Sequence, residues 1–180
     1  MKIVLVGDSI RMGYEPLVRQ KVGDRAEVWA PAENCGSSMA HRDRFVAWAI
    51  EPKPDVYHFN CGIHDLHVID LGPRFTVSAY ARNLRIVVKR LKTETNARLI
   101  WATSTPMLAP LNPNAKRYPA VELYNAAALR VMEKNGIEVN DLYQAVMDAG
   151  AEKCLSEDKV HMAPYGNEVL SDAIVRLIFG

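Results

Sequence analysis

Short apolar runs alternate with longer amphipathic stretches along the whole chain. Five of these runs are rich in aliphatic residues, and their length is typical of buried strands. They are Lys2–Val6, Ala26–Ala30, Asp55–Asn60, Arg98–Thr103 and Ile137–Asn140. Apolar residues recur at helical spacing in the stretches between and after them, which predicts six helices. These are Met12–Val22, Met39–Ile50, Thr76–Thr95, Tyr118–Lys134, Leu142–Asp148 and Pro164–Ile178.

Proline, glycine and asparagine mark where several of these elements end. Pro52 and Pro54 close the second helix, and Asn135-Gly136 is a typical helix stop. Pro164 suits the first turn of the last helix. The remaining stretches are predicted loops: Pro31–Ser38, Cys61–Pro73, Ser104–Arg117 and Ala151–Ala163.

The regular alternation of strands and helices predicts an α/β fold. Residues 1–180 are expected to form a single domain, since the length suits one domain and neither repeat nor linker interrupts the pattern. The expected architecture is a three-layer α/β/α sandwich around a five-stranded parallel sheet. In such sheets the ligand site lies at the carboxyl ends of the strands.

Composition is that of an ordinary soluble globular protein. Lysine and arginine total 22 and aspartate and glutamate 21, so the formal net charge is +1 and nothing indicates a nucleic-acid partner. The first apolar run is too short for a signal peptide or a membrane span. We therefore expect no membrane span and a cytoplasmic location, or a secreted or periplasmic one if a signal peptide had been removed. The sequence leaves the oligomeric state open.

The three cysteines, Cys35, Cys61 and Cys154, lack the spacing of a zinc site or a CxxC pair. Reduced thiols are the simplest expectation. Cys35 and Cys61 precede glycines on neighbouring predicted loops, so a disulfide between them is the alternative.

Ser9 is the leading candidate for a catalytic group. It lies in Gly7-Asp8-Ser9, directly after the first predicted strand and before a helix. Free backbone N–H groups at a helix N-terminus can face a developing negative charge. Position alone is equally consistent with a helix cap, a role that serine often fills.

A serine nucleophile needs a base and a group that orients the base. His161 lies in a polar loop before the last helix, and Asp158 lies three residues earlier. That spacing in a loop lets the carboxylate return to the imidazole. His161 and Asp158 therefore favour nucleophilic chemistry at Ser9.

At this point the chain resembles the SGNH hydrolases, also called GDSL-type esterases. Gly7-Asp8-Ser9 matches the first block of that family, Gly36 the second, and Asp158-Lys159-Val160-His161 the fourth. The spacing of the blocks matches across nearly the whole chain. The resemblance implies the flavodoxin-like SGNH hydrolase fold, a triad of Ser9, Asp158 and His161, and no cofactor.

The family's oxyanion donors are two backbone N–H groups, here those of Ser9 and Gly36, and an asparagine side chain of the third block. This chain departs from the pattern, because Gly62-Ile63-His64-Asp65 has His64 where the asparagine belongs. We hypothesise that His64 is the third donor, which requires the right tautomer or protonation. Asn34 and Asn60, which lie near these loops, are the alternatives.

The other histidines allow two further interpretations, a metal site or purely structural roles. His58, His64, Asp65, His67 and Asp70 could together hold a metal, although no HExxH helix is present and we expect no metal. Otherwise His58 is expected in the core and Asp65 to accept backbone N–H bonds that brace its loop. His41 is expected at the surface.

Hydrolysis of a small-molecule or carbohydrate ester, with a short acyl group such as acetyl, is the function we expect. The loop Ser104–Arg117, which mixes apolar and amide groups, would form one wall of the site. The alternatives are a lysophospholipase or thioesterase, and a non-catalytic binding domain on the same fold. A nucleotide-binding protein is disfavoured, because Gly7–Gly13 matches neither phosphate-loop pattern.

Overall fold

The structure is a computed structural model that describes residues 1–69, 72–109 and 120–180. Its main sheet has five parallel strands in the order β2-β1-β3-β6-β7. The strands are β1 (Lys2–Val6), β2 (Glu27–Trp29), β3 (Val56–Phe59), β6 (Arg98–Ala102) and β7 (Glu138–Asn140). All five predicted strands are confirmed, and no end shifts by more than one residue.

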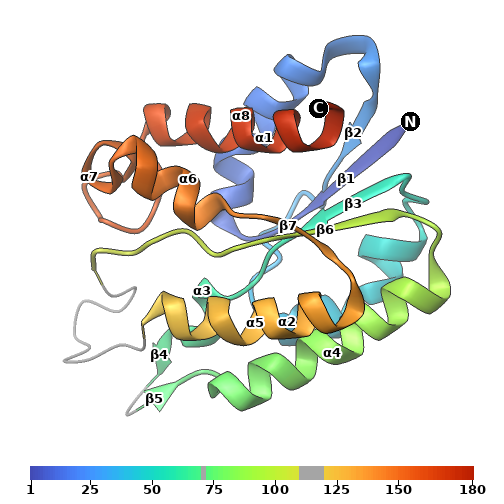
Figure 1. Ribbon diagram of the computed structural model, residues 1–180, viewed down its shortest axis with the longest axis horizontal. Coiled ribbons are helices and arrows are strands. Elements are labelled where there is room, and N and C mark those ends of the chain that lie inside the picture. Colours follow the sequence, from blue (N-terminus) through green and yellow to red (C-terminus); the bar gives the residue numbers. More distant parts are fainter. Residues whose placement is uncertain (70–71, 110–119) are drawn as a thin grey trace.

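Helices cover both faces of this sheet, so the three-layer α/β/α architecture is confirmed (Figure 1). One face carries α1 (Ser9–Val22), α6 (Leu142–Ala149) and α8 (Pro164–Phe179). The other carries α2 (Ser38–Asp43), α4 (Val77–Glu94) and α5 (Val121–Asn135). The apolar face predicted for the third helix is buried in α4, including Tyr80, Leu84, Val88 and Leu91. Residues Tyr118 and Pro119, which begin the predicted fourth helix, lie outside the described residues.

Several predicted boundaries were wrong for local reasons. The first helix begins at Ser9 rather than Met12, because Asp8 caps it by accepting the N–H of Ile10 at 2.9 Å. The predicted helix Met39–Ile50 is divided into α2 and a π-helical turn, Val46–Ile50. A capping side chain or a change in hydrogen-bond spacing leaves little trace in hydrophobic periodicity.

Two predicted loops contain short elements. The stretch Cys61–Pro73 forms helix α3 (Ile63–Leu66) and the hairpin strands β4 (Val68–Ile69) and β5 (Gly72–Pro73). The stretch Ala151–Ala163 begins with helix α7 (Ala151–Cys154). Elements of two to four residues are too short for periodicity to reveal.

All three cysteines are free and buried, so the alternative of a Cys35–Cys61 disulfide is wrong. His41 is also buried, with 3% exposure, which corrects the expectation that it lies at the surface. His58 is fully buried, as expected, and its Nε2 lies 3.2 Å from Nδ2 of Asn140. None of the helices within the described ranges combines the length and apolar character needed to cross a membrane.

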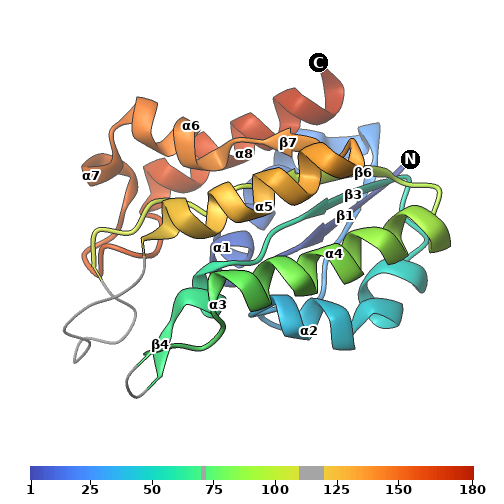
Figure 2. The same ribbon diagram turned by 60° about the horizontal axis from the view of Figure 1, so that its bottom comes forward.

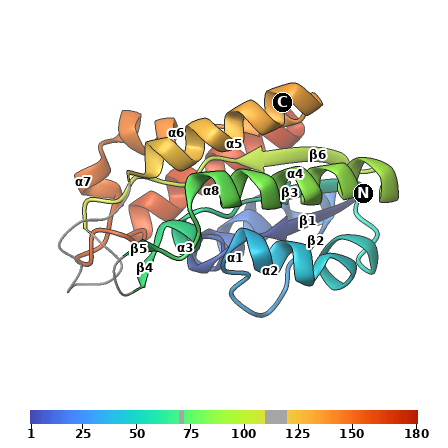
Figure 3. The ribbon, with the colours of Figure 1, turned by 90° about the horizontal axis from the view of Figure 1, so that it is seen from below.

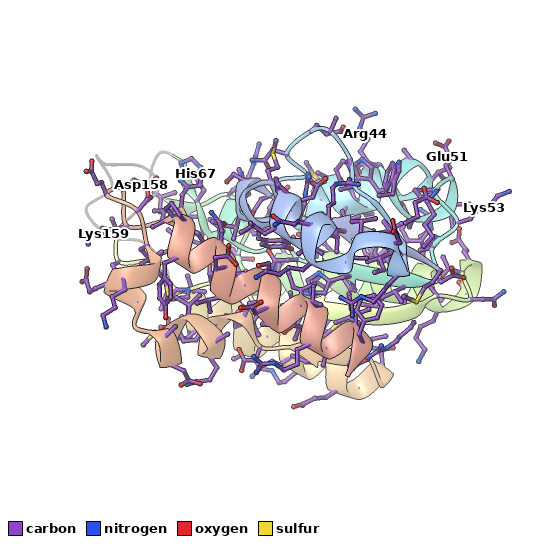
Figure 4. The ribbon with its side chains drawn as sticks, turned by 90° about the horizontal axis from the view of Figure 1, so that it is seen from above. Arg44, Glu51, Lys53, His67, Asp158 and Lys159 are labelled. Atoms are coloured by element: carbon purple, nitrogen blue, oxygen red, sulfur yellow. The ribbon has the colours of Figure 1, made fainter. Side chains whose placement is uncertain are left out.

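The carboxyl ends of the strands meet at one end of the molecule. Helices α3 and α7 and the β4–β5 hairpin gather there in all three ribbon views (Figures 1–3). Asp158, Lys159 and His67 lie at this end, whereas Arg44, Glu51 and Lys53 lie at the opposite one (Figure 4). The first of these ends is where a parallel sheet with this architecture carries its ligand site.

Candidate active site

Ser9 is the first residue of α1, immediately after the chain leaves the buried strand β1. Its side chain is half-buried, and as the first helical residue its N–H has no acceptor in the helix. Asp8, only 1% exposed, precedes it as the helix cap. Desolvation raises the pKa of Asp8, opposed by the nearby charge of His64 and the N–H of Ile10.

Ser9, His161 and Asp158 form one hydrogen-bonded series. The Ser9 Oγ lies 2.8 Å from Nε2 of His161. The Nδ1 of the same ring lies 2.5 Å from Oδ2 of Asp158. The structure therefore brings together three side chains that lie up to 152 positions apart in the sequence.

A tight loop holds Asp158 and His161 in this geometry. The loop is closed where Leu155 and Met162 form a β-bridge. Within it, the N–H of Ser156 donates to the His161 carbonyl at 2.8 Å. Lys159 has a φ of 61°, a left-handed conformation that is uncommon outside glycine.

The Asp158 carboxylate is ordered by several donors besides the imidazole. Its Oδ1 accepts the hydroxyl of Ser156 at 2.7 Å and the N–H groups of Val160 and His161, each at 2.9 Å. Desolvation acts to raise the pKa of Asp158, but the hydrogen bonds from His161, Val160 and Ser156 outweigh it and hold that pKa well below its usual range. The carboxylate is thus ionised at neutral pH and suited to stabilise a charged imidazole.

The loop with Gly36 lies against the strand that leads to Ser9. The N–H of Cys35 donates to the Gly7 carbonyl at 3.1 Å. The N–H of Gly36 donates to Oδ1 of Asn34 at 2.9 Å, so it is engaged within its own loop. Gly36 has a φ of 59°, and a Cβ there would meet no atom within 4 Å.

Asn60 is not a free amide donor. Its Nδ2 donates to the Ala102 carbonyl at 2.7 Å and lies 3.4 Å from Oγ of Ser104. Both of its amide hydrogens are therefore committed to the end of β6 and the residues just after it. The alternative in which Asn60 completes an oxyanion hole has no support in this geometry.

His64 lies on α3, after the end of β3, and is half-buried. Desolvation lowers its pKa, opposed by the charge of Asp8 and assisted by those of Arg74, His67 and His161. The ring is therefore neutral at neutral pH and can donate from one nitrogen. Its ring forms no hydrogen bond to another of the described residues.

Asp65 braces the loop after β3, as the sequence predicts. Its Oδ2 accepts the N–H of Ser38 at 2.8 Å and its Oδ1 accepts the Ser38 hydroxyl at 2.5 Å. Asn83, on α4, donates to the same hydroxyl at 3.0 Å. Burial raises the pKa of Asp65 to about 6, partly offset by the bonds from Ser38. Neither Ser38 nor Asn83 was predicted from the sequence as part of the site.

Arg11 is a third residue that was not predicted from the sequence. It lies two positions after Ser9 but is only 3% exposed. Its Nη1 bonds Oε2 of Glu15 at 2.5 Å, and its Nη2 donates to the Glu33 carbonyl at 2.7 Å. Arg11 therefore joins the helix that begins with Ser9 to the loop that leads to Gly36.

Two further expectations involve stretches that the structure describes only in part. Among residues 1–69, 72–109 and 120–180, no group of three or more His, Cys, Asp or Glu side chains is arranged to hold a metal ion, and Asp70 lies outside them. Of the expected wall Ser104–Arg117, residues 110–117 lie outside the description. In its first part, the N–H of Leu108 donates to the Lys159 carbonyl at 2.9 Å.

The α/β/α sandwich has a parallel sheet, and a serine, a histidine and an aspartate lie in series at the carboxyl edge of that sheet. This combination is that of an SGNH-type hydrolase. A scan of protein families matches residues 5–169 to the GDSL-like Lipase/Acylhydrolase family. The chain belongs to that family, which confirms the resemblance seen in the sequence, and it is a carboxylic ester hydrolase.

Solved structures agree on the fold. The chain is similar to a lipase/acylhydrolase from Enterococcus faecalis, with 24% identity, a TM-score of 0.80 and coverage of 98% of this chain and 94% of that one. An acetyl xylan esterase has 17% identity, a TM-score of 0.81 and coverage of 99% and 100%. An acetylxylan esterase from Geobacillus stearothermophilus has 20% identity, a TM-score of 0.78 and coverage of 99% and 94%. No curated protein matches the sequence.

Proposed function

We propose that the protein is a serine esterase that removes short acyl groups, acetyl above all, from small-molecule or carbohydrate alcohols. The observation that carries this proposal is the unbroken series from Ser9 Oγ through His161 to Asp158, with separations of 2.8 and 2.5 Å. The 2.8 Å separation lies within the range that proton transfer from a nucleophile to its base requires, and the shorter one lets Asp158 orient that base.

In this mechanism the Ser9 Oγ attacks the ester carbonyl carbon while His161 Nε2 takes the hydroxyl proton. The C–O bond to the alcohol then breaks, and His161 returns the proton to the leaving oxygen, which leaves an acyl group on Ser9. A water molecule, deprotonated by His161, attacks that acyl group; the bond to Ser9 Oγ then breaks, His161 returns the proton to Ser9 Oγ, and the acid is released. Asp158 stays ionised throughout and stabilises the imidazolium.

The oxyanion of each tetrahedral intermediate needs donors that are already in place. The N–H of Ser9, at the start of α1, is one. Gly36 supplies the second if its N–H turns away from Asn34, a movement that its open surroundings and its glycine backbone permit. His64 supplies the third as a neutral ring with one N–H directed at the oxyanion.

The similarity to solved structures favours a short acyl group. Two of the structurally similar proteins are acetyl xylan esterases, which supports both an acetyl group and a carbohydrate alcohol.

A series of p-nitrophenyl esters with acetyl, butyryl and octanoyl groups tests the proposal, with Ser9→Ala as control. We expect kcat/KM to be highest for acetyl and to disappear in Ser9→Ala. Highest activity on octanoyl would replace the short-acyl preference with that of a lysophospholipase or thioesterase. No turnover of any ester by the wild type would favour a binding domain.

A further inference from the structure

A small cavity lies directly behind the turn that presents Ser9. It is lined by Asp8 and Arg11 from the start of α1, by Asn60 and Ile63 beyond β3, and by Thr105 beyond β6. Its volume is about 10 Å³, which is close to the least that a single water molecule requires. The cavity is therefore a site for one water molecule and nothing larger.

Three polar atoms of the residues that line this cavity are buried without a partner in the described part of the chain. They are Oδ2 of Asp8, Nε of Arg11 and Oγ1 of Thr105. Their residues are 1%, 3% and 3% exposed. Each buried polar group left unsatisfied costs about 1–3 kcal/mol, so three around one cavity require a common explanation.

The other polar atoms of the Asp8 and Arg11 side chains already form hydrogen bonds. The unpartnered atoms therefore cannot pair with one another by a simple side-chain rotation. The other Asp8 oxygen accepts the N–H of Ile10, which caps α1. The two terminal nitrogens of Arg11 are held by Glu15 and by the Glu33 carbonyl. Rotation of either side chain toward the other would break one of these bonds.

We propose that one ordered water molecule occupies this cavity and bridges Asp8, Arg11 and Thr105. The water accepts the N–H of Arg11 Nε, donates one hydrogen to Oδ2 of Asp8 and forms its third hydrogen bond with the Thr105 hydroxyl. Three hydrogen bonds are typical of a buried water in a protein. Its donors and acceptors match the three unpartnered atoms one to one.

The position of this water gives it a role in the proposed reaction. It joins the turn of Ser9 to the segment after β6, whose Leu108 donates to Lys159 in the loop of Asp158 and His161. The water thus connects the turn that carries Ser9 to the segment that contacts the loop of His161. Because Thr105 holds this water, it is a positioning residue. This role rests on the proposed esterase function, whereas the presence of the water does not.

A high-resolution crystal structure of the wild type tests the site directly, together with Thr105→Val and Thr105→Ser. We expect density for one water within about 2.6–3.2 Å of all three atoms in the wild type and in Thr105→Ser. In Thr105→Val, which keeps the shape but removes the hydroxyl, the water should be lost or displaced. A wild-type cavity without density would overturn the proposal, whatever the variants do.

Kinetics on p-nitrophenyl acetate test the positioning role. We expect Thr105→Val to lower kcat by roughly 10-fold, as a small misplacement of reacting groups does, with KM unchanged and with rescue in Thr105→Ser. Equal kcat in all three proteins would refute the role. A wild type that hydrolyses no ester yet holds the water would instead refute the esterase function and leave the water site intact.

Discussion

Acidification should destabilise this protein through a histidine that lacks any polar partner. His41 is 3% exposed and packs edge-on against Trp48, with ring centroids 5.5 Å apart. Neither of its ring nitrogens has a hydrogen-bond partner in the described structure. Burial alone lowers the pKa of His41 from 6.5 to about 4.

The sign of the effect follows from linkage between protonation and folding. The folded state favours the neutral form of the His41 ring. The contribution of this ring to stability is therefore fully present above pH 6.5 and is lost as the pH falls toward 4. At pH 5 this difference in pKa corresponds to a loss of about 2 kcal/mol in the free energy of unfolding, against a few tenths at pH 7.

Other buried groups also titrate in this range, so the wild type alone cannot isolate His41. Burial lowers the pKa of His58 to about 4, which adds to the loss at low pH. Burial raises the pKa of Asp65 to about 6, which acts in the opposite direction. The difference between the wild type and His41→Leu removes these shared contributions.

Urea unfolding followed by tryptophan fluorescence at pH 7, 6 and 5 measures this difference. We expect the stability of His41→Leu relative to the wild type to rise by about 2 kcal/mol between pH 7 and pH 5. Met39→Leu, on the same helix but without a titrating group, should follow the wild type at every pH. A difference between wild type and His41→Leu that is the same at pH 7 and pH 5 would refute the reasoning.

Substitutions at three further positions test the loops around the candidate site. Asp158→Asn should lower kcat on p-nitrophenyl acetate by roughly 10³- to 10⁴-fold, because the imidazole loses its orienting charge; a loss below 10-fold would exclude Asp158 from the triad. His64→Ala should lower kcat by roughly 10- to 1000-fold, while His64→Asn keeps a donor and most of the rate; an unchanged rate in His64→Ala would remove His64 from the oxyanion hole. Lys159→Gly should have a free energy of unfolding within about 1 kcal/mol of the wild type, whereas that of Lys159→Val should be clearly lower, because glycine adopts a φ of 61° without strain and a β-branched residue does not. Equal stability of the two variants would contradict that account.

Much of the fold could be predicted because its signals are local and repeated. Runs of aliphatic residues identify the strands, and helical spacing of apolar residues identifies a helix such as α4. The proximity of Ser9, Asp158 and His161 was also predictable, although they lie far apart in the sequence. In a parallel sheet the loops that carry them emerge at the same edge, and their motifs match a known family.

The errors arose where tertiary packing decides the outcome. Arg11 and His41 are polar residues on helices, which usually indicates an exposed face, yet both are buried. One partner of Arg11 is the backbone carbonyl of Glu33, for which the sequence has no signal. Nor can sequence show that Asn60 has already committed its amide to Ala102. Hydrogen bonds to the main chain depend on how loops meet, which residue types alone do not determine.

Labelling with a fluorophosphonate probe tests the central claim most directly, because the probe reacts covalently with an activated serine. The account predicts that wild-type protein takes up one equivalent of the probe and that mass spectrometry of the digested protein locates it on Ser9. It also predicts that Ser9→Ala takes up none. Labelling that persists in Ser9→Ala, or an esterase that hydrolyses p-nitrophenyl acetate without labelling at Ser9, would contradict it.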